Sequence, residues 1–349
     1  MRVIFDLGHP AHFHLFKHVI SALTDSGHDV EIIARQKDCL AELLDRAQLP
    51  YHLIGRTKNT LAALGWQNLR AFRKAVSLAR CKQTDLIVGT SVIGGPAARL
   101  TGATSVIFEE DDAKAVPVFA KTAYPMAHYI VTPDCLKFEN YGHKHLTYPG
   151  YHELAYLHPN RYQPNPDVRC ALGLNPYERY FLIRLVSLTA HHDIGEKGVS
   201  TAQAKALVEH LAEHGRVFIS AEKTVDKTLE PYLLRLSAER IFDVICFSDM
   251  VIGDSQTMIA EAAVLGVPSI RCNTFVGRLT YLEQLEHKYG LTVGIRPENF
   301  EALPAQVDEW LSQPDLKQRW QQKRQMMLND CVDLTDWIIR LFEDLAERT

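Results

Sequence analysis

Residues 253–268 read Gly-Asp-Ser-Gln-Thr-Met-Ile-Ala-Glu-Ala-Ala-Val-Leu-Gly-Val-Pro and follow the short apolar run 250–252. This order predicts a strand, a tight turn, one short helix and a Gly-x-Pro exit. Asp254 or Ser255 can cap the helix through a side-chain oxygen. The free backbone N–H groups of the first helical turn, together with the helix dipole, then form an anion site.

Thr257 and Glu261 are four residues apart and therefore share one face of this helix. These two residues suit a nucleotide. The Thr257 hydroxyl would lie near a phosphate, and the Glu261 carboxylate, one turn deeper, would accept hydrogen bonds from the ribose hydroxyls. An ordinary capped core helix explains the same pattern without a ligand, and both interpretations stay open. The predicted nucleotide-binding set here is Gly253, Asp254, Ser255, Gln256, Thr257 and Glu261.

The composition of the chain limits the classes of protein to consider. Its 349 residues are 46% hydrophobic and 23% charged, so two domains with sizeable cores are expected. A net charge of −4 without a basic run disfavours a nucleic-acid partner. The seven cysteines form no CxxC pair, which disfavours a zinc ribbon or a disulfide framework. No signal peptide or transmembrane stretch is predicted, so we expect a cytoplasmic protein, with contact at the inner face of the membrane left open.

Strand-like and helix-like segments alternate along the chain, which predicts mostly parallel sheets with right-handed crossovers. Residues 149–179 interrupt this alternation with five prolines. We therefore expect an N-terminal domain at 1–150, a linker at 151–179 and a C-terminal domain at 180–349. The amphipathic last helix, 334–346, could return to the first domain or serve an oligomer interface, so a monomer and a homodimer are both compatible with the sequence.

Several weaker patterns lie in the second half of the chain. They predict a helix at 229–237, a strand at 244–247 and helical structure from 316 to 343. In open parallel sheets, ligands bind beyond the carboxyl ends of the strands. Candidate site residues should therefore lie on the turns that lead from a strand into a helix.

The first such turn, residues 8–14, follows the predicted strand 2–7 and reads Gly-His-Pro-Ala-His-Phe-His. Gly8 lets the backbone turn sharply and approach a ligand. A neutral imidazole of His9 or His14 can act as a base, and nearby N–H groups can hold an anion. A metal site and histidines that only satisfy local backbone groups are the alternatives. No G-x-G-x-x-G or P-loop signature occurs, which disfavours those nucleotide-binding classes.

A second candidate turn carries Glu109, Glu110, Asp111 and Asp112 after the predicted strand 105–108. Clustered carboxylates raise one another's pKa, which suits general acid–base catalysis. They could instead bind a divalent cation together with phosphates. A solvated acidic loop is the third interpretation.

A third candidate turn, residues 187–195, follows the first strand of the second domain. Arg184, within that strand, could clamp a phosphate or a carboxylate. His192 beside Asp193 could form an oriented acid or base, and a capping loop is the alternative. Glu222 follows the next strand and is a further candidate for ligand binding.

The motifs in these turns resemble those of a known family: Asp-x-Gly-His-Pro-Ala-His at 6–12, Ala-x-His-Asp-x-Gly at 190–195, Gly-Asp-Ser-Gln-Thr-Met at 253–258 and Lys-Tyr-Gly-Leu at 288–291. The resemblance covers about residues 2–295. It is to the bacterial and archaeal family called domain of unknown function 354, within the GT-B superfamily of nucleotide-sugar enzymes. It implies an α/β fold with two Rossmann-like domains, whose parallel sheets face a central cleft.

The resemblance also implies residue roles. It places the ribose on Glu261 and the phosphates on residues 255–257. The first turn is similar to the Gly-Gly-His turn of lipid-linked N-acetylglucosaminyl transferases. The acidic turn and the His192 turn fall where UDP-N-acetylglucosamine 2-epimerases keep catalytic carboxylates and a histidine. The family pattern Asp-Thr-Glu-His-Ala reads Glu-Glu-Asp-Asp-Ala at 109–113, so a carboxylate stays at Asp111 and the histidine is replaced.

The leading interpretation is a GT-B glycosyltransferase that uses a nucleotide-diphosphate sugar as substrate, without metal or cofactor, in surface polysaccharide or glycolipid synthesis. Its acceptor would be lipid-linked or a saccharide, and His9, His14 or Asp111 would be the base. The rival is an NDP-sugar 2-epimerase or hydrolase with Asp111, Glu109 and His192 as the catalytic set. A nucleotide-sugar-binding protein without catalysis is the third interpretation.

Overall fold

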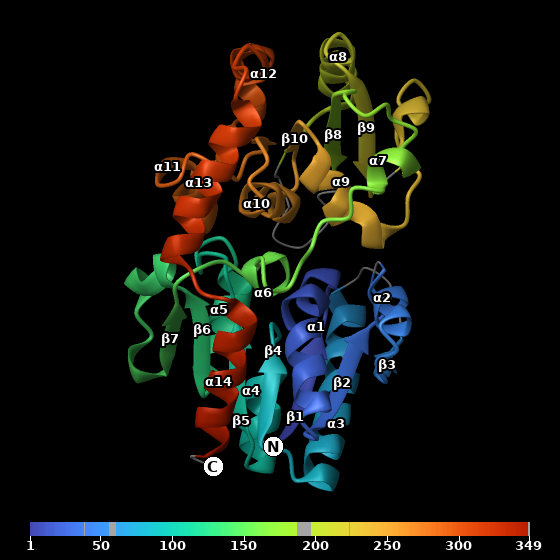
Figure 1. Cartoon of the computed structure of the whole chain (residues 1–349). Helices are drawn as coiled ribbons and strands as arrows, with labels where there is room; N and C mark the ends of the chain where they lie inside the picture. Colours follow the sequence, from blue (N-terminus) through green and yellow to red (C-terminus); the bar gives the residue numbers. More distant parts are fainter. Residues whose placement is uncertain (38, 56–60, 187–196, 223, 348–349) are drawn as a thin grey trace. The chain divides into compact units, whose positions relative to one another are not determined.

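The computed structural model describes the chain except residues 38, 56–60, 187–196, 223 and 348–349. Its contacts divide the chain into two compact units, residues 1–161 with 331–349, and residues 162–330 (Figure 1). Each unit holds one parallel sheet flanked by helices. The predicted α/β class with two Rossmann-like halves is therefore confirmed.

In the described part of the first unit, seven parallel strands lie in the order β3-β2-β1-β4-β5-β6-β7. The strands are β1 (Arg2–Leu7), β2 (Asp29–Arg35), β3 (His52–Ile54), β4 (Leu86–Gly89), β5 (Thr104–Phe108), β6 (Tyr129–Pro133) and β7 (His145–Tyr148). The helices are α1 (Pro10–Asp25), α2 (Leu40–Arg46), α3 (Leu61–Lys82), α4 (Gly94–Thr101), α5 (Pro117–Ala123), α6 (Leu154–Leu157) and α14 (Leu334–Ala346). The direction of the crossovers reverses between β1 and β4, which makes this the switch point where ligands bind in open parallel sheets.

An aromatic cluster explains why the last helix belongs to the first unit. Phe5 of β1 lies 5.3 Å from Phe16 and 6.2 Å from Phe342 of α14, measured between ring centroids. In Figure 1, α14 (red) runs beside the helices of this unit, and it contacts α1 and α6. Burial of these rings joins the end of the chain to the core formed by its beginning. Residues 151–161, expected in a linker, lie in this unit, and all four residues of α6 are buried.

In the described part of the second unit, five parallel strands lie in the order β12-β11-β10-β8-β9. The strands are β8 (Tyr180–Leu185), β9 (Arg216–Ala221), β10 (Met250–Gly253), β11 (Ser269–Cys272) and β12 (Thr292–Ile295). The helices are α7 (Val168–Ala171), α8 (Thr201–Ala212), α9 (Ile241–Phe247), α10 (Gln256–Val264), α11 (Thr280–His287), α12 (Ala302–Leu311) and α13 (Leu316–Asp330). None of the helices in the described residues is long and apolar enough to cross a membrane.

Three predicted elements differ from the structure. Residues 244–247 belong to helix α9 and form no strand, because periodicity cannot distinguish a short buried run of helix from a strand. Residues 229–237 contain only a short 3-10 helix, which agrees with the loss of a backbone donor at Pro231. The predicted helical stretch 316–343 is two helices, because Asp333 caps the second one by accepting a hydrogen bond from the backbone N–H of Asp336.

Candidate functional site

A buried ion pair fixes the turn at the switch point of the first sheet. Asp6, at the end of β1, is only 1% exposed and accepts hydrogen bonds from both terminal nitrogens of Arg35, at 2.9 and 3.1 Å. Ser91 donates a further bond to the same carboxylate. A Cβ atom on Gly89 would lie 2.6 Å from the carbonyl oxygen of Asp6, so this strand approach requires glycine. The network holds in place the backbone that enters the turn at Gly8.

Two histidines of that turn bind backbone N–H groups through Nδ1. His9 caps α1 and accepts from the N–H of Ala11 at 3.2 Å, and His12 accepts from the N–H of Gly8 at 3.2 Å. Burial, and then the charges of His9 and Arg35, lower the pKa of His12 well below its usual value. A neutral ring that accepts through Nδ1 carries its proton on Nε2, so His12 presents an N–H donor on its other edge.

His14 lies in a different environment from the other two. Its ring centroid is 5.2 Å from that of Tyr156 in α6, and burial lowers its pKa to about 3. The ring is therefore neutral and packs among aromatic side chains. Among the described residues, the clusters close enough to share a metal ion lie in the second unit: His210, His214 and Asp308, and Glu283, Glu286 and His287.

The acidic turn after β5 folds back on itself. One carboxylate oxygen of Glu109 accepts from the backbone N–H groups of Glu110, at 3.0 Å, and Asp111, at 3.2 Å. Burial, and then the charge of Asp111, raise the pKa of Glu109 well above its usual value. The same two causes raise the pKa of Glu110 to about 8. At neutral pH, Glu110 is therefore mainly protonated and can act as a proton donor.

His152, which was not among the predicted site residues, joins this turn. Its backbone N–H donates to Glu110 at 3.3 Å, and its Nδ1 lies 3.4 Å from the same oxygen. Burial lowers the pKa of His152 to about 4, and its Nε2 has no hydrogen-bond partner among the described residues. A protonated carboxyl beside a neutral imidazole is an acid–base pair without net charge. His152 follows β7, a strand that was not predicted, and lies within the predicted linker; the Gly-Tyr-His-Glu turn at 150–153 was the available signal.

In the second unit, the turn after β10 is held by hydrogen bonds to backbone groups. Ser255 caps α10 by accepting from the N–H of Met258 at 3.2 Å. Asp254 is 2% exposed, and its two carboxylate oxygens accept from the N–H groups of Val186 at 2.8 Å and Val199 at 3.2 Å. The Asp254 carboxylate thus ties three segments of the unit together.

The first turn of α10 retains the features that the sequence predicted. The first intrahelical bond runs from the N–H of Ile259 to the carbonyl of Ser255. The N–H groups of Gln256 and Thr257 precede it, where a helix presents its donors. Glu261, on the same face one turn later, is 6% exposed. The helix tip can therefore offer backbone donors to an anion, and its buried carboxylate can accept from hydroxyls.

Arg184 and Glu222, predicted as separate ligands, form an ion pair in the structure. Arg184 also donates to the hydroxyl of Ser220 at 2.9 Å, so the pair links the ends of β8 and β9. Both terminal nitrogens of the guanidinium thus have partners, whereas its buried Nε has no hydrogen-bond partner among the described residues. His192 and Asp193 lie outside the described residues.

Comparison with solved structures identifies relatives of this architecture. A UDP-GlcNAc 2-epimerase from Methanocaldococcus jannaschii is 15% identical, with a TM-score of 0.66 over 98% of this chain and 99% of that one. The glycosyltransferase SsfS6 of Streptomyces sp. SF2575, complexed with thymidine diphosphate, is 16% identical, with a TM-score of 0.64 over 99% of both chains. The UDP-bound MnaA of S. aureus is 11% identical, with a TM-score of 0.66 over 91% of this chain and 90% of that one. These likenesses establish the two-domain GT-B fold.

Comparison of the sequence alone identifies a family and no curated relative. None of the curated proteins matches this sequence. Residues 1–283 match the model of a family described as "Protein of unknown function (DUF354)", and the chain therefore belongs to that family.

Proposed function

We propose that this chain is a glycosyltransferase that uses a nucleotide-diphosphate sugar, in surface polysaccharide or glycolipid synthesis. The observation that carries the proposal is the first turn of α10, where the N–H groups of Gln256 and Thr257 precede the buried carboxylate of Glu261. Backbone donors and the helix dipole suit the diphosphate, and the carboxylate suits the ribose hydroxyls. The fold shared with a thymidine diphosphate complex of a glycosyltransferase supports this assignment.

In the proposed reaction, the second unit stabilises the leaving group and the first unit supplies the base. The α10 helix stabilises the negative charge that develops on the leaving diphosphate, which needs no metal. A base in the first unit removes the proton of the acceptor hydroxyl; the candidates are His9, His14 and Asp111, to which we add His152. The protonated Glu110 can orient a hydroxyl group by donating a hydrogen bond to it.

Calorimetric titration of the full chain with UDP, TDP and a panel of nucleotide sugars tests the nucleotide site. Because a hydrogen bond to a charged group contributes about 1.5–3 kcal/mol, Glu261→Gln should weaken binding about tenfold or more. Glu309→Gln, an exposed change on α12, is the matched control and should have no effect. Unchanged affinity in a folded Glu261→Gln variant would remove the proposed site.

A second function, NDP-sugar 2-epimerase or hydrolase, is favoured by the acidic turn. Glu109, Glu110 and His152 supply proton donors and acceptors in one buried cluster, and such chemistry requires no acceptor molecule. A proton and phosphorus NMR time course with UDP-N-acetylglucosamine alone separates the two functions. A new sugar signal or UDP release would indicate the epimerase or hydrolase. Line broadening without turnover would favour the transferase, and turnover should then appear when acceptors are added.

A further inference from the structure

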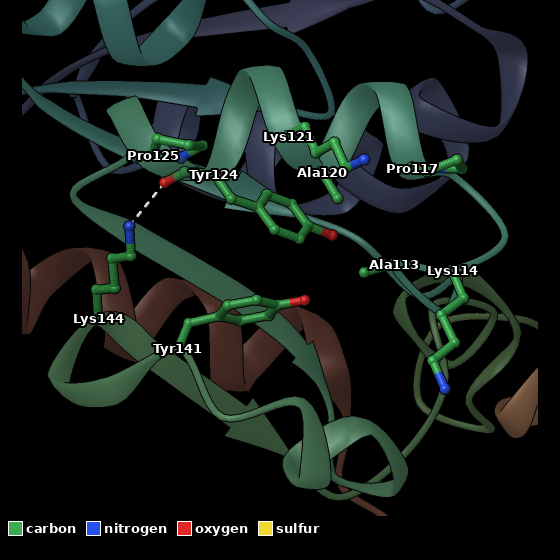
Figure 2. Close-up of a pocket in the computed structure, with 9 residues that line it drawn as sticks. All are labelled: Ala113, Lys114, Pro117, Ala120, Lys121, Tyr124, Pro125, Tyr141 and Lys144. Atoms are coloured by element: carbon green, nitrogen blue, oxygen red, sulfur yellow. Dashed lines mark hydrogen bonds between the residues drawn. The ribbon is translucent and has the colours of Figure 1, made fainter.

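A pocket of about 630 Å³ opens in the first unit between α5, the 3-10 helix η1 (Tyr124–Met126) and the segment before β7 (Figure 2). Its lining consists of two tyrosines, two prolines, two alanines and three lysines. The lining residues include no carboxylate. A pocket with an apolar body and cationic side chains is suited to an organic anion.

Two tyrosines form the deep part of this pocket. The rings of Tyr124 and Tyr141 meet edge to face, 4.9 Å apart, and both hydroxyls point towards Ala113 (Figure 2). Tyr141 donates to Glu139, whose other oxygen accepts from the N–H of Ala113 at 2.7 Å. Tyr124 is only 4% exposed, yet its hydroxyl has no hydrogen-bond partner among the described residues. A buried hydroxyl without a partner is costly, so its direction into the pocket points to a ligand oxygen.

The lysines supply the positive charge at the mouth of the pocket. Lys114 and Lys121 are exposed, whereas Lys144 is half-buried and donates to the carbonyl of Tyr124 at 2.7 Å. The ammonium groups of Lys114 and Lys121 can reach an anion at the rim, and Lys144 holds η1 in place. The charged part of a ligand would therefore lie at the mouth, near solvent.

The deep end of the pocket has the opposite electrostatic character. Burial raises the pKa of Tyr124, and the charges of Glu109 and Asp111 raise it further. These carboxylates of the acidic turn are thus close enough to disfavour a second anion beside the Tyr124 hydroxyl. A neutral hydroxyl of the ligand suits that position.

We propose that this pocket binds a phosphate ester of a hydroxyl-bearing, largely apolar ring compound. The phosphate lies at Lys114 and Lys121, the apolar part contacts the proline, alanine and tyrosine side chains, and the free hydroxyl accepts a hydrogen bond from Tyr124. That hydroxyl is then next to the acidic turn, which makes the ligand the acceptor of the transferase. Only this acceptor role rests on the proposed function; binding in the pocket does not.

Four small probes distinguish the contributions of the phosphate, the ring and the free hydroxyl of the ligand. Their affinities are measured by calorimetry on the full chain without nucleotide sugar. The probes are 4-hydroxyphenyl phosphate, phenyl phosphate, hydroquinone and inorganic phosphate. One hydrogen bond raises binding affinity by about tenfold or less. We therefore expect 4-hydroxyphenyl phosphate to bind about fivefold to tenfold more tightly than phenyl phosphate. Inorganic phosphate should bind most weakly. Equal affinity for inorganic phosphate and 4-hydroxyphenyl phosphate, or no binding of the latter, would overturn the proposal.

Matched variants assign each feature to a side chain. Tyr124→Phe removes only the hydroxyl, so it should abolish the preference for 4-hydroxyphenyl phosphate over phenyl phosphate without lowering the unfolding temperature. The double variant Lys114→Gln with Lys121→Gln should weaken both aryl phosphates and leave hydroquinone unchanged. The control is Lys137→Gln, an exposed lysine that lies outside the pocket. A comparable loss in Lys137→Gln would show that the charge effect is not local, against the proposal.

The phosphate ester could be a lipid headgroup or a free metabolite, because both share this chemistry. Val118, next to the pocket residue Pro117, is 76% exposed, and Phe138 is 65% exposed. The lipid source would be assigned if the chain cosediments with phosphatidylglycerol vesicles and not with phosphatidylcholine vesicles, and if the double lysine variant loses this cosedimentation. Binding of the aryl phosphates without cosedimentation would assign a free phosphate ester. Probe binding with no turnover in the presence of nucleotide sugars would leave the pocket established and reject the acceptor role.

Discussion

Carboxylates at the ends of the two sheets have different kinds of hydrogen-bond partner. In the first unit, two carboxylates pair with basic side chains, Asp6 with Arg35 and Glu110 with His152. In the second unit, the buried carboxylate of Asp254 accepts from two backbone N–H groups. Backbone donors keep their protons at every physiological pH, whereas Glu110, with its pKa raised to about 8, can exchange its proton near neutral pH. The comparison suggests that the second unit supplies fixed binding groups and the first supplies proton transfer.

The largest effect is expected from breaking the ion pair of the first unit. Asp6→Asn leaves Arg35 buried without its counter-charge, so the free energy of unfolding should fall by about 3–5 kcal/mol. Urea denaturation measures the change. The double variant Asp6→Leu with Arg35→Met removes both charges and should recover most of the loss. A single variant that costs less than about 1 kcal/mol would mean that solvent already screens the pair.

Removing the Asp254 carboxylate should have the next largest effect. Asp254→Ala leaves the N–H groups of Val186 and Val199 without their acceptor, at a cost of about 2–3 kcal/mol in the free energy of unfolding. Asp254→Asn keeps one acceptor oxygen and should recover about half of that loss. Because backbone N–H groups do not titrate, the loss should be the same at pH 6 and pH 8. A strong pH dependence would contradict the distinction between the two turns.

The Glu110 and His152 pair should make the first unit sensitive to pH. The pKa of Glu110 is raised to about 8, so its contribution to stability is lost as the pH rises from the carboxylate's ordinary range to about 8. The pKa of His152 is lowered to about 4, so its contribution is lost as the pH falls below about 6.5 towards 4. Above pH 6.5 the contribution of His152 is complete, and Glu110 by itself should lower stability by at most about 1.4 kcal/mol per pH unit.

Urea denaturation of the wild type and of Glu110→Gln at pH 6.5 and pH 8 checks this decline. The variant cannot ionise, so its free energy of unfolding should change less between the two pH values than that of the wild type. Glu309→Gln, on the surface of α12, should behave as the wild type. Parallel pH curves for wild type and Glu110→Gln would show that Glu110 does not titrate in this range.

The same comparison shows which features the sequence could predict. The Ser255 cap depends on a neighbour three residues away, so the local pattern identified both the helix and its capped first turn. Asp254 was predicted as a ligand, whereas its carboxylate is bound to Val186 and Val199, more than fifty residues away in sequence. Local patterns contain no information about such long-range hydrogen bonds.

His152 shows that local sequence patterns also miss long-range contacts between the residues of the candidate site. The acidic turn was recognised because its carboxylates are adjacent in sequence. The histidine reaches Glu110 from 42 residues away, through a strand, β7, that is only partly buried and precedes a proline. Such a strand lacks the continuous apolar run that identified the central strands, so its closing turn was assigned to the linker. The parallel sheets were predictable for the opposite reason, since their central strands are buried and mostly apolar.

The smallest expected effect tests the cap of α10. Ser255→Ala removes the acceptor for the N–H of Met258 and should lower the free energy of unfolding by about 1 kcal/mol. Ser255→Gly should cost only a few tenths of a kcal/mol, because glycine is tolerated at this position of a helix. Both variants keep the N–H groups of Gln256 and Thr257, so UDP affinity should change less than in Glu261→Gln. If UDP affinity instead fell as far in Ser255→Gly as in Glu261→Gln, the serine hydroxyl would be a ligand of the phosphates, and binding in the second unit would depend on a side chain as well as on fixed backbone donors.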